Sequence, residues 1–378
     1  MPWAVPLHPV PRPTFAPRTI DPDMPKVTFL NQRGGFQETL KARIDAYFAE
    51  HRVKPTGNTA LHVKTAVLLP SALSLYIVLL AVTMPTWLSI VLAGLLGLTL
   101  ALIGFNVMHD ACHGSYSSKP WLNELMGLTA NCLGGNAFMW KMKHNVVHHT
   151  FTNVDGMDDD IQLQPLLRQS NNQKRYWIHR LQHIYGFLLY SGTSLLMVTA
   201  ADYRKYFTRR IQSTPIAHMS PKEHVIFWTS KVLYMFFYCA LPIMVLGWGP
   251  WVVGFFVMHA CMGMAFAITF QVAHVVEDTH FEVARTDKKI EQEWAAHQVM
   301  TTANFAMRSK LVSWMAGGLN FQIEHHLFPR ISHVHYPKLA PIVQAVCLEH
   351  GIPYTHYRTM GGAIASHFRY LRALGRRN

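Results

Sequence analysis

Residues 87–113 read WLSIVLAGLLGLTLALIGFNVMHDACH, an apolar run that ends in His109 and His113. An α-helix rises about 1.5 Å per residue, so about twenty apolar residues cross a hydrocarbon core of roughly 30 Å. A spacing of four residues places both imidazoles on one face of a helix, where they can bind the same metal ion. The stretch therefore predicts a membrane-spanning helix with metal ligands at one end.

Three further apolar runs have the same character, and short breaks join the four runs in pairs. The predicted spans are 65–82, 87–107, 225–246 and 251–272, with breaks at 83–86 and 247–250. Neither break contains a charged residue, whereas residues 106–224 contain twelve lysines and arginines. The positive-inside rule then places both breaks outside, and both termini and the middle segment in the cytoplasm.

These runs predict an all-α integral membrane protein with four transmembrane helices in two hairpins and a cytoplasmic helical cap that holds the metal site. Apolar stretches at 121–139 and 184–200 leave a pair of extra spans as an alternative. We prefer helices at the cytoplasmic interface for both stretches, because a single additional crossing would place the last histidine cluster on the wrong side of the membrane.

The expected organisation is a proline-rich amino-terminal arm at 1–35, a membrane domain at 36–350 and a basic carboxyl-terminal tail at 351–378. The arm has no continuous apolar core and so does not resemble a signal peptide. Within the domain, Leu40 and Ile44 lie at helical spacing and predict an amphipathic helix over 36–50. Its basic neighbours suit an anionic membrane surface.

Composition supports a membrane protein and argues against nucleic-acid binding. Half of the 378 residues are apolar and only 15% are charged. The formal charge of +13 comes from basic residues that flank apolar runs, and no DNA- or RNA-binding motif is present. The five cysteines form no CxxC pair, which fits a reducing cytoplasmic face or simple packing.

Histidines gather at positions that the predicted topology brings to one depth, just inside the membrane. The eight candidate ligands are His109, His113, His144, His148, His149, His274, His325 and His326. A structural zinc site is saturated by four ligands, so eight nitrogen donors indicate two metal ions with open positions for chemistry. Ligation by nitrogen alone suits iron, copper or zinc.

Acidic residues near these histidines allow two interpretations. Four carboxylates sit beside candidate ligands and could accept imidazole N–H bonds in space: Asp110, Glu277, Asp278 and Glu324. Asp155 and Asp158–Asp160 lack the alternating spacing and terminal glutamate of a calcium loop. We expect a solvated or salt-bridged face there. His259 falls in mid-span, where a neutral histidine hydrogen-bonded across helices is the expectation.

The motifs HxxxH at His109–His113, HxxxHH at His144–His149 and QxxHH at Gln322–His326 resemble the three histidine boxes of membrane fatty-acid desaturases. Longer matches are HNVVHHTFTN at 144–153 and NFQIEHHLFP at 320–329, and the resemblance covers roughly residues 60–350. It implies a desaturase domain with two iron ions, O2 as co-substrate and no bound haem or flavin. It also implies an additional histidine from the fourth span, which His274 matches.

The glutamine that opens the third box resembles the front-end desaturases, and Gln322 is a candidate metal ligand or a residue that orients one. Many of these enzymes carry a fused cytochrome b5 domain with a His-Pro-Gly-Gly motif, which this sequence does not contain. The resemblance therefore implies a separate electron donor, a ferredoxin or a cytochrome b5-like protein with its reductase. The substrate would be a fatty-acyl chain on CoA, carrier protein or membrane lipid, and the location the bacterial inner membrane.

Two other functions remain open from the sequence. A di-iron hydroxylase or ketolase of lipids or carotenoids could use the same ligand set. A histidine-rich metal transporter would also combine histidines with apolar spans, although transport sites favour the middle of the bilayer. The expected position of the histidines at cytoplasmic helix ends favours a desaturase.

Overall fold

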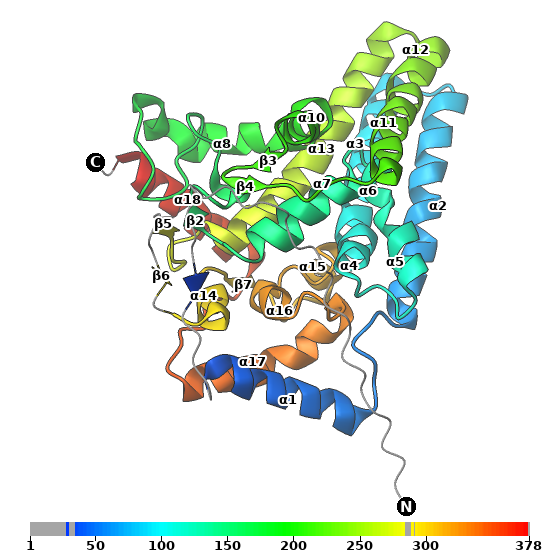
Figure 1. Ribbon diagram of the computed structural model, residues 1–378. Coiled ribbons are helices and arrows are strands. Elements are labelled where there is room, and N and C mark those ends of the chain that lie inside the picture. Colours follow the sequence, from blue (N-terminus) through cyan, green and yellow to red (C-terminus); the bar gives the residue numbers. More distant parts are fainter. Residues whose placement is uncertain (1–27, 30–34, 284–288, 291, 377–378) are drawn as a thin grey trace, which may run out of the picture.

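The computed structural model describes residues 28–29, 35–283, 289–290 and 292–376, and the predicted arm at 1–35 lies almost entirely outside this part. Helices dominate it, and its strands are two residues long. Figure 1 shows a group of long helices that rises toward one end, with shorter helices gathered around its base.

Four helical stretches are long and apolar enough to cross a membrane, which confirms the four predicted spans. They are Thr59–Ala81, Thr86–His113, Pro221–Leu246 and Trp248–His274. Their elements are α2 (Thr59–Ala81), α3 (Thr86–Ile103), η1 (Gly104–Met108), α4 (His109–His113), α11 (Pro221–Met235), η6 (Phe236–Ala240), α12 (Leu241–Leu246) and α13 (Trp248–His274).

The helices extend beyond several of the predicted span boundaries, and two of these differences have clear local reasons. Helix α2 begins at Thr59, ahead of the predicted start, because the Asn58 side chain accepts a hydrogen bond from the Leu61 backbone N–H. The first turns of α2 contain polar residues, so hydropathy alone does not predict that the helix begins at Thr59. The second break is shorter than expected, because Gly247 turns the chain at φ 80° and Pro250 fits in the first turn of α13.

The middle segment is made of short helices. Its elements are α5 (Pro120–Gly127), α6 (Thr129–Cys132), α7 (Ala137–Lys141), η2 (Met142–His148), β2 (Val154–Asp155), η3 (Asp159–Ile161), η4 (Trp177–Leu181), α8 (Gln182–Ser191), α9 (Thr193–Leu196), η5 (Met197–Ala201), α10 (Asp202–Thr208), β3 (Arg210–Ile211) and β4 (Thr214–Pro215). The stretch 121–139 is thus divided among three helices too short to span. The stretch 184–200 belongs to a longer pair, Trp177–Ser191 and Thr193–Thr208, bent by 57°.

The remaining elements form the base of the molecule, apart from the last helix, which lies beside α8. They are β1 (Thr28–Phe29), α1 (Phe36–His51), β5 (Glu282–Val283), β6 (Lys289–Ile290), α14 (Trp294–Met300), β7 (Asn304–Phe305), α15 (Lys310–Met315), α16 (Gln322–Leu327), η7 (His333–His335), α17 (Tyr336–Glu349), β8 (His356–Tyr357) and α18 (Met360–Arg376). Strands pair as β1–β6, β2–β5 and β7–β8 in parallel and β3–β4 antiparallel. The three parallel pairs join segments far apart in sequence.

Helix α1 confirms the predicted amphipathic helix, but α1 does not offer its apolar face to a membrane. Leu40 and Ile44 are 1% and 2% exposed, packed against α14, α16 and α17. Full burial of such a side chain contributes about 1.5–3 kcal/mol. The exposed Arg43–Glu349 ion pair between α1 and α17 contributes about 0–1 kcal/mol. Apolar burial therefore holds α1 in place.

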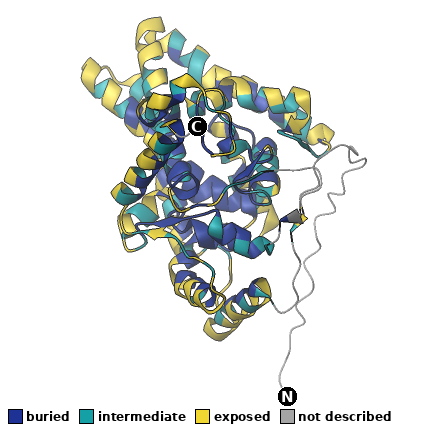
Figure 2. Ribbon diagram, turned by 90° about the vertical axis from the view of Figure 1, so that its left-hand side faces the viewer, coloured by how far each residue is buried: buried dark blue, intermediate teal, exposed yellow. Residues whose placement is uncertain are grey.

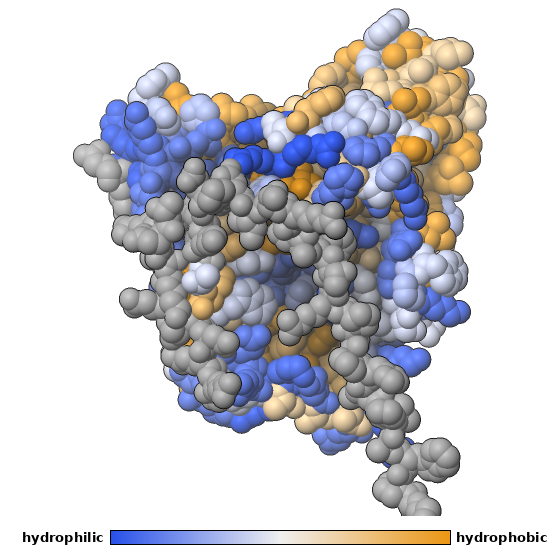
Figure 3. All heavy atoms as spheres, in the orientation of Figure 1, coloured by the Kyte–Doolittle hydropathy of each residue, from blue (hydrophilic) through white to orange (hydrophobic). Residues whose placement is uncertain are grey.

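Surface character separates the two ends of the molecule. Figure 3 shows hydrophobic residues over the end formed by α2, α11 and α12, and mainly hydrophilic residues over the base. Figure 2 shows the buried residues concentrated in the middle, below the long helices. The carboxyl-terminal segment contributes to this interior, because Leu371 and Leu374 of α18 are fully buried. The most buried region is therefore where the spans meet the base.

Candidate metal centre

All eight candidate histidines lie together in this buried region, and none is more than 8% exposed. They come from four places in the chain: α4, the η2 region, the last residue of α13, and α16. The fold therefore unites side chains that are more than two hundred residues apart in the sequence. Two of the candidates illustrate the result, because the rings of His109 and His325 lie 4.4 Å apart between centroids.

The first histidine pair follows a local widening of its helix. The π-helical turn η1 ends at Met108, and α4 then carries His109 and His113. Their ring centroids are 4.7 Å apart, as the spacing of four residues requires. Gly114 ends the helix in the left-handed conformation at φ 75°. The two imidazoles thus project from the very end of the second span.

A second π-helical segment explains how three histidines of the middle motif point the same way. In a regular α-helix His144 and His148 share a face, whereas His149 is turned away by a further residue. Here η2 is π-helical, and the His149 N–H donates to the carbonyl oxygen of His144 five residues earlier. The wider turn brings the Nε2 atoms of His144 and His149 within 3.2 Å.

Four imidazoles form the first of two groups, the His109 group, whose possible ligand atoms lie within 4.8 Å of one another. Its members are His109, His113, His144 and His325. The Nε2 atom of His144 lies 3.3 Å from that of His109 and 3.4 Å from that of His325. The ring of Trp140 packs against His144 in a tilted arrangement, at 4.4 Å between centroids.

The second group, the His274 group, consists of His148, His274 and His326. The side-chain amide of Gln322 lies between two of its members, with Nε2 3.0 Å from His274 Nε2 and 3.3 Å from His326 Nε2. The amide oxygen of Gln322 is buried without a hydrogen-bond partner in the described structure. Oxygen and nitrogen of an amide exchange places by a flip of the side chain, which would turn the oxygen toward this group.

His149 lies between the two groups. Its Nε2 atom is 3.0 Å from that of His325, and its ring stacks on His326 at 4.4 Å between centroids. His149, His325 and His326 themselves qualify as a possible three-ligand set. The eight side chains therefore form one continuous cluster with two centres.

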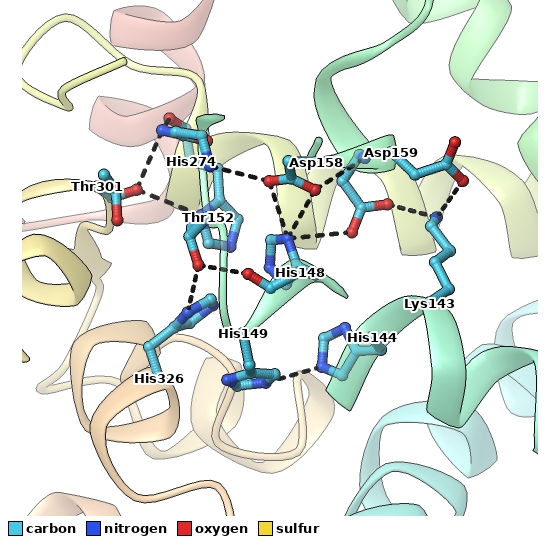
Figure 4. Close-up of polar contacts among 12 residues, drawn as sticks. Lys143, His144, His148, His149, Thr152, Asp158, Asp159, His274, Thr301 and His326 are labelled. Atoms are coloured by element: carbon cyan, nitrogen blue, oxygen red, sulfur yellow. Dashed lines mark hydrogen bonds and ion pairs between the residues drawn. The ribbon is translucent and has the colours of Figure 1, made fainter. Parts of the chain in front are cut away.

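The second ring nitrogens of four histidines are held by neighbouring groups. His326 Nδ1 lies 2.8 Å from Gln298 Oε1, His274 Nδ1 lies 3.4 Å from the Thr301 carbonyl oxygen, and His325 Nδ1 lies 3.2 Å from the Tyr336 hydroxyl. His148 Nδ1 lies 3.1 Å from both carboxylate oxygens of Asp158 (Figure 4). Partners of this kind fix the ring and leave Nε2 free for a metal ion.

Asp158 is a site residue that the sequence reasoning missed. The prediction for Asp158–Asp160 is a solvated or salt-bridged face, and Asp158 instead lies fully buried, where it pairs with His148. The backbone N–H of Asn153 also donates to its carboxylate, so a turn of the chain closes around the side chain. The available signal was an acidic run about ten residues after His148, but spacing alone does not show which carboxylate faces inward.

The neighbouring acids form the expected salt bridges. Lys143 Nζ lies 2.5 Å from Asp160, and Lys205 Nζ lies 3.5 Å from Asp159. Burial by itself would raise the pKa of the Asp160 carboxyl, but Lys143 and His148 together outweigh burial and lower it. Asp160 is also 3.4 Å from His148 Nδ1. Figure 4 shows Asp159 and Lys143 beyond Asp158, on the side away from His274 and His326.

Burial and mutual repulsion lower the pKa values of His144, His325 and His326 well below the ordinary value. For His148, burial also opposes the charged form. The carboxylates of Asp158 and Asp160 outweigh that effect, and the pKa of His148 is raised. The lowered pKa values favour the neutral form that binds metal, and His148 differs from these neighbours in the direction of its shift.

The four carboxylates next to candidate ligands in sequence have other partners in space, which answers the question that the sequence left open. In the described structure Asp110 accepts from Ser332 and His333, and Glu324 accepts from Asn304 and Tyr354. Glu277 pairs with Arg369, and Asp278 accepts from Tyr357. Adjacent residues on a helix point in different directions, so proximity in sequence did not place them at the rings.

His259 behaves as expected for a neutral mid-span histidine. Its two ring nitrogens lie 3.0 Å from the Ser194 hydroxyl and 2.8 Å from the Tyr234 hydroxyl. These bonds connect α13 to α9 and α11. His259 is therefore a structural contact between helices and lies outside the cluster.

Unpaired nitrogen atoms show that the cluster fits metal ions. In the described structure His113 Nε2 and His148 Nε2 are buried without a hydrogen-bond partner, and the Nε2 atoms of His109, His144, His149 and His325 face one another. Leaving such atoms unsatisfied is costly, and neutral imidazoles that face one another cannot all donate. Bound cations would satisfy them. A cavity of about 20 Å³, lined in part by His148, His274 and Phe270, adjoins the His274 group.

Comparison with known proteins gives the same assignment. The family model described as fatty acid desaturase matches residues 85–358. The chain is 34% identical to the sn-1 linoleoyl-lipid 6-desaturase of Arthrospira platensis, over 92% of this chain and 95% of that protein. It is 36% identical to the protein of the same name from Synechocystis sp., over 91% and 97%. It is also 36% identical to the acyl-lipid (8-3)-desaturase of Physcomitrium patens, over 90% and 72%.

The match includes all three histidine motifs and the fourth-span histidine, which the fold gathers into one buried cluster. This distinguishes the chain from a metal transporter, the function of another class that the sequence left open. The chain belongs to the fatty acid desaturase family and is a membrane enzyme of the front-end-like type.

Proposed function

We propose that the protein is an oxygen-dependent acyl-lipid desaturase that introduces a cis double bond at a histidine-ligated di-iron centre. One observation carries this proposal: eight buried histidines converge as two groups that share His149. The relatives named as acyl-lipid desaturases support a lipid-linked acyl chain in preference to an acyl-CoA.

The proposed ligands follow the two groups. His109, His113, His144 and His325 would hold one iron ion, and His148, His274 and His326 the other, with His149 between them. Gln322 would complete the second set or orient it, since its amide lies against His274 and His326. When bound, the iron ions would supply the activation of O2 needed to remove hydrogen from an unactivated methylene.

The protein's own residues would fix geometry and exclude water. Asp158, Gln298 and the Thr301 carbonyl hold rings of the His274 group by their second nitrogens. Loss of two hydrogens with reduction of O2 to two waters also consumes two electrons and two protons. We propose that a separate ferredoxin or cytochrome b5-like protein with its reductase supplies the electrons.

The proposed arrangement in the membrane is two hairpins, α2–α3 and α11–α13, with both termini and the metal cluster on the cytoplasmic side. Basic residues of the middle segment support this orientation through the positive-inside rule. The desaturase domain would extend from 36 to 350, and α18 packs onto the same interior. A bacterial inner membrane would suit the similarity to the Arthrospira and Synechocystis proteins.

Lipid analysis of a host that expresses the protein tests the function. We expect acyl chains lighter by two hydrogens, and cleavage at the new double bond gives its position. The His148→Ala variant should yield no product, whereas His218→Ala, at an exposed histidine outside the cluster, should retain it. Products heavier by one oxygen would show a hydroxylase instead. Retained product in His148→Ala would contradict the di-iron proposal.

A further inference from the structure

The bent helix pair Trp177–Ser191 and Thr193–Thr208 passes a length and hydropathy test for a fifth span. The histidine cluster excludes a single crossing there. The rings of His148, before the pair, and His274, after it, lie 4.8 Å apart between centroids. Two spans, Pro221–Leu246 and Trp248–His274, also separate these histidines. A third crossing would put His274 on the opposite membrane face from His148, so the bent pair starts and ends on one side.

One face of η4 and α8 nevertheless exposes large apolar side chains. Trp177, Leu181, Ile184 and Leu188 are 82%, 60%, 62% and 74% exposed. Their spacing of four, three and four residues aligns them on one face of the helix. We call these four residues the apolar stripe. The other face is occupied by the protein, because η4 and α8 pack against α18 and α13.

A basic rim borders the apolar stripe. Arg372 and Arg376 are exposed and one turn apart on α18, and Arg180 is exposed on η4. Helices η4 and α18 approach closely, since a Cβ placed on Gly375 would lie 2.0 Å from the His179 carbonyl oxygen. Burial lowers the pKa of His183 on α8, and the nearby charges of Arg372 and Arg376 lower it further. The rim therefore concentrates positive charge beside the stripe.

We propose that the apolar stripe and the basic rim bind the anionic surface of the bilayer on the side of the metal centre. The four stripe residues would enter the boundary between headgroups and acyl chains, and the three arginines would contact phospholipid phosphates. Two features favour a lipid surface over a protein: the charge complements anionic headgroups, and α8 packs against the spanning helix α13. The inference rests on the proposed four-span arrangement.

A spin label at Leu188→Cys, with Cys132 replaced by serine, measures the depth of the stripe in nanodiscs that contain phosphatidylglycerol. We expect greater access to O2 than to a water-soluble nickel chelate, at a shallow depth below the phosphates. A label at Glu38→Cys on α1 should show the opposite. A label at the bilayer midplane would overturn the proposal in favour of insertion. A water-exposed label would also overturn it. So would a label that becomes protected from water only when an acidic protein is added.

A separate experiment tests whether the basic rim recognises anionic headgroups. Energy transfer from a fluorophore at position 188 compares fluorescent phosphatidylglycerol with the matching phosphatidylcholine. The double variant Arg372→Gln and Arg376→Gln should reduce the preference for phosphatidylglycerol by roughly tenfold or more. Lys54→Gln with Lys338→Gln removes the same charge from exposed positions on the base and should leave the preference for phosphatidylglycerol unchanged. If both double variants reduced the preference equally, the proposal that the basic rim binds anionic headgroups would be wrong.

The four-span arrangement is checked separately, so that its failure can be recognised. A cysteine at Met84, between α2 and α3, should react only with a reagent added on the face opposite the Glu38→Cys label. If Met84 and Glu38 react from the same face, the span arrangement itself is wrong. If they react from opposite faces and the label at position 188 is water-exposed, the lipid contact alone is wrong.

Discussion

The two histidine groups are built from the same side chain but are held in different ways. The His274 group is fixed by hydrogen bonds in which the second ring nitrogen of His148 donates to the Asp158 carboxylate and that of His326 donates to Gln298 Oε1. The His109 group is fixed mainly by its helices and by ring packing on Trp140, with one hydroxyl contact from Tyr336 to His325. One group is therefore sensitive to residues outside the ligand set, and the other is much less so.

This difference follows from where the ligands sit. His109 and His113 lie on one short helix, whose backbone sets their spacing without help. The His109 group also draws on η2 and α16, but two of its four members share one helix, whereas each of the three members of the His274 group comes from a different element: α13, η2 or α16. Asn153 adds another contact between distant segments, because its side-chain amide donates to the carbonyl oxygens of His274 and Thr301. Distant ligands require such supports because a misplaced ring cannot bind a metal ion.

Removal of one ligand from each group should give the largest effect. We expect His109→Ala and His274→Ala each to abolish desaturation and to lower bound iron from two ions per chain to about one. Elemental analysis of the purified protein gives the metal content, and lipid analysis gives the activity. His259→Gln provides a control at a buried histidine outside the cluster and should keep both ions. Full metal content in either ligand variant would refute the two-centre arrangement.

Asp158→Asn should show directly that the His274 group depends on residues outside the ligand set more than the His109 group does. The amide keeps the volume but loses the charge that orients His148, so metal affinity should fall by about 10–100-fold at the His274 group alone. Competition with a chelator, followed by elemental analysis, would show one ion lost early and one retained. Asp155→Asn alters a buried carboxylate that accepts from Ser170 and Gln173 and should not change the order of loss.

Acidification should also remove the metal ion of the His274 group before that of the His109 group. The pKa of His148 is raised, so a proton competes with metal there as pH falls through that value. The pKa values of His144 and His325 are well below the ordinary one, so the His109 group should retain its ion to lower pH. Metal retained after dialysis at stepwise lower pH measures this. Simultaneous loss of both ions would show that the groups are one coupled site.

Hydropathy and motif spacing were sufficient to predict the four spans and the eight clustered histidines. Both signals are local: an apolar run reports burial in lipid, and spacing of four residues reports a shared helix face. The apolar face of α1 shows the limit. Leu40 and Ile44 indicated a membrane contact, but α17, about three hundred residues away, covers them. Sequence pattern shows that a face is apolar and not what covers it.

The supporting residues were the least predictable part of the site. Asp110, Glu277, Asp278 and Glu324 stand next to ligands in sequence and contact other groups, whereas Asp158 stands ten residues from His148 and contacts its ring. The π-helical turn η2 was equally hidden, since no residue type marks it. Ligands can be read from chemistry and spacing, but their supports depend on tertiary contacts.

Tyr336→Phe should give the smallest effect and the sharpest test of the comparison. It removes the one hydroxyl near a second ring nitrogen of the His109 group, at 3.2 Å from His325 Nδ1, and keeps the buried ring in place. A neutral hydrogen bond contributes about 0.5–1.5 kcal/mol, so metal affinity should fall by about tenfold at most. Chelator competition should therefore still remove the ion of the His274 group first. If Tyr336→Phe weakens its own group as much as Asp158→Asn weakens the other, then hydrogen bonding supports both groups equally, and helix geometry alone does not hold the His109 group.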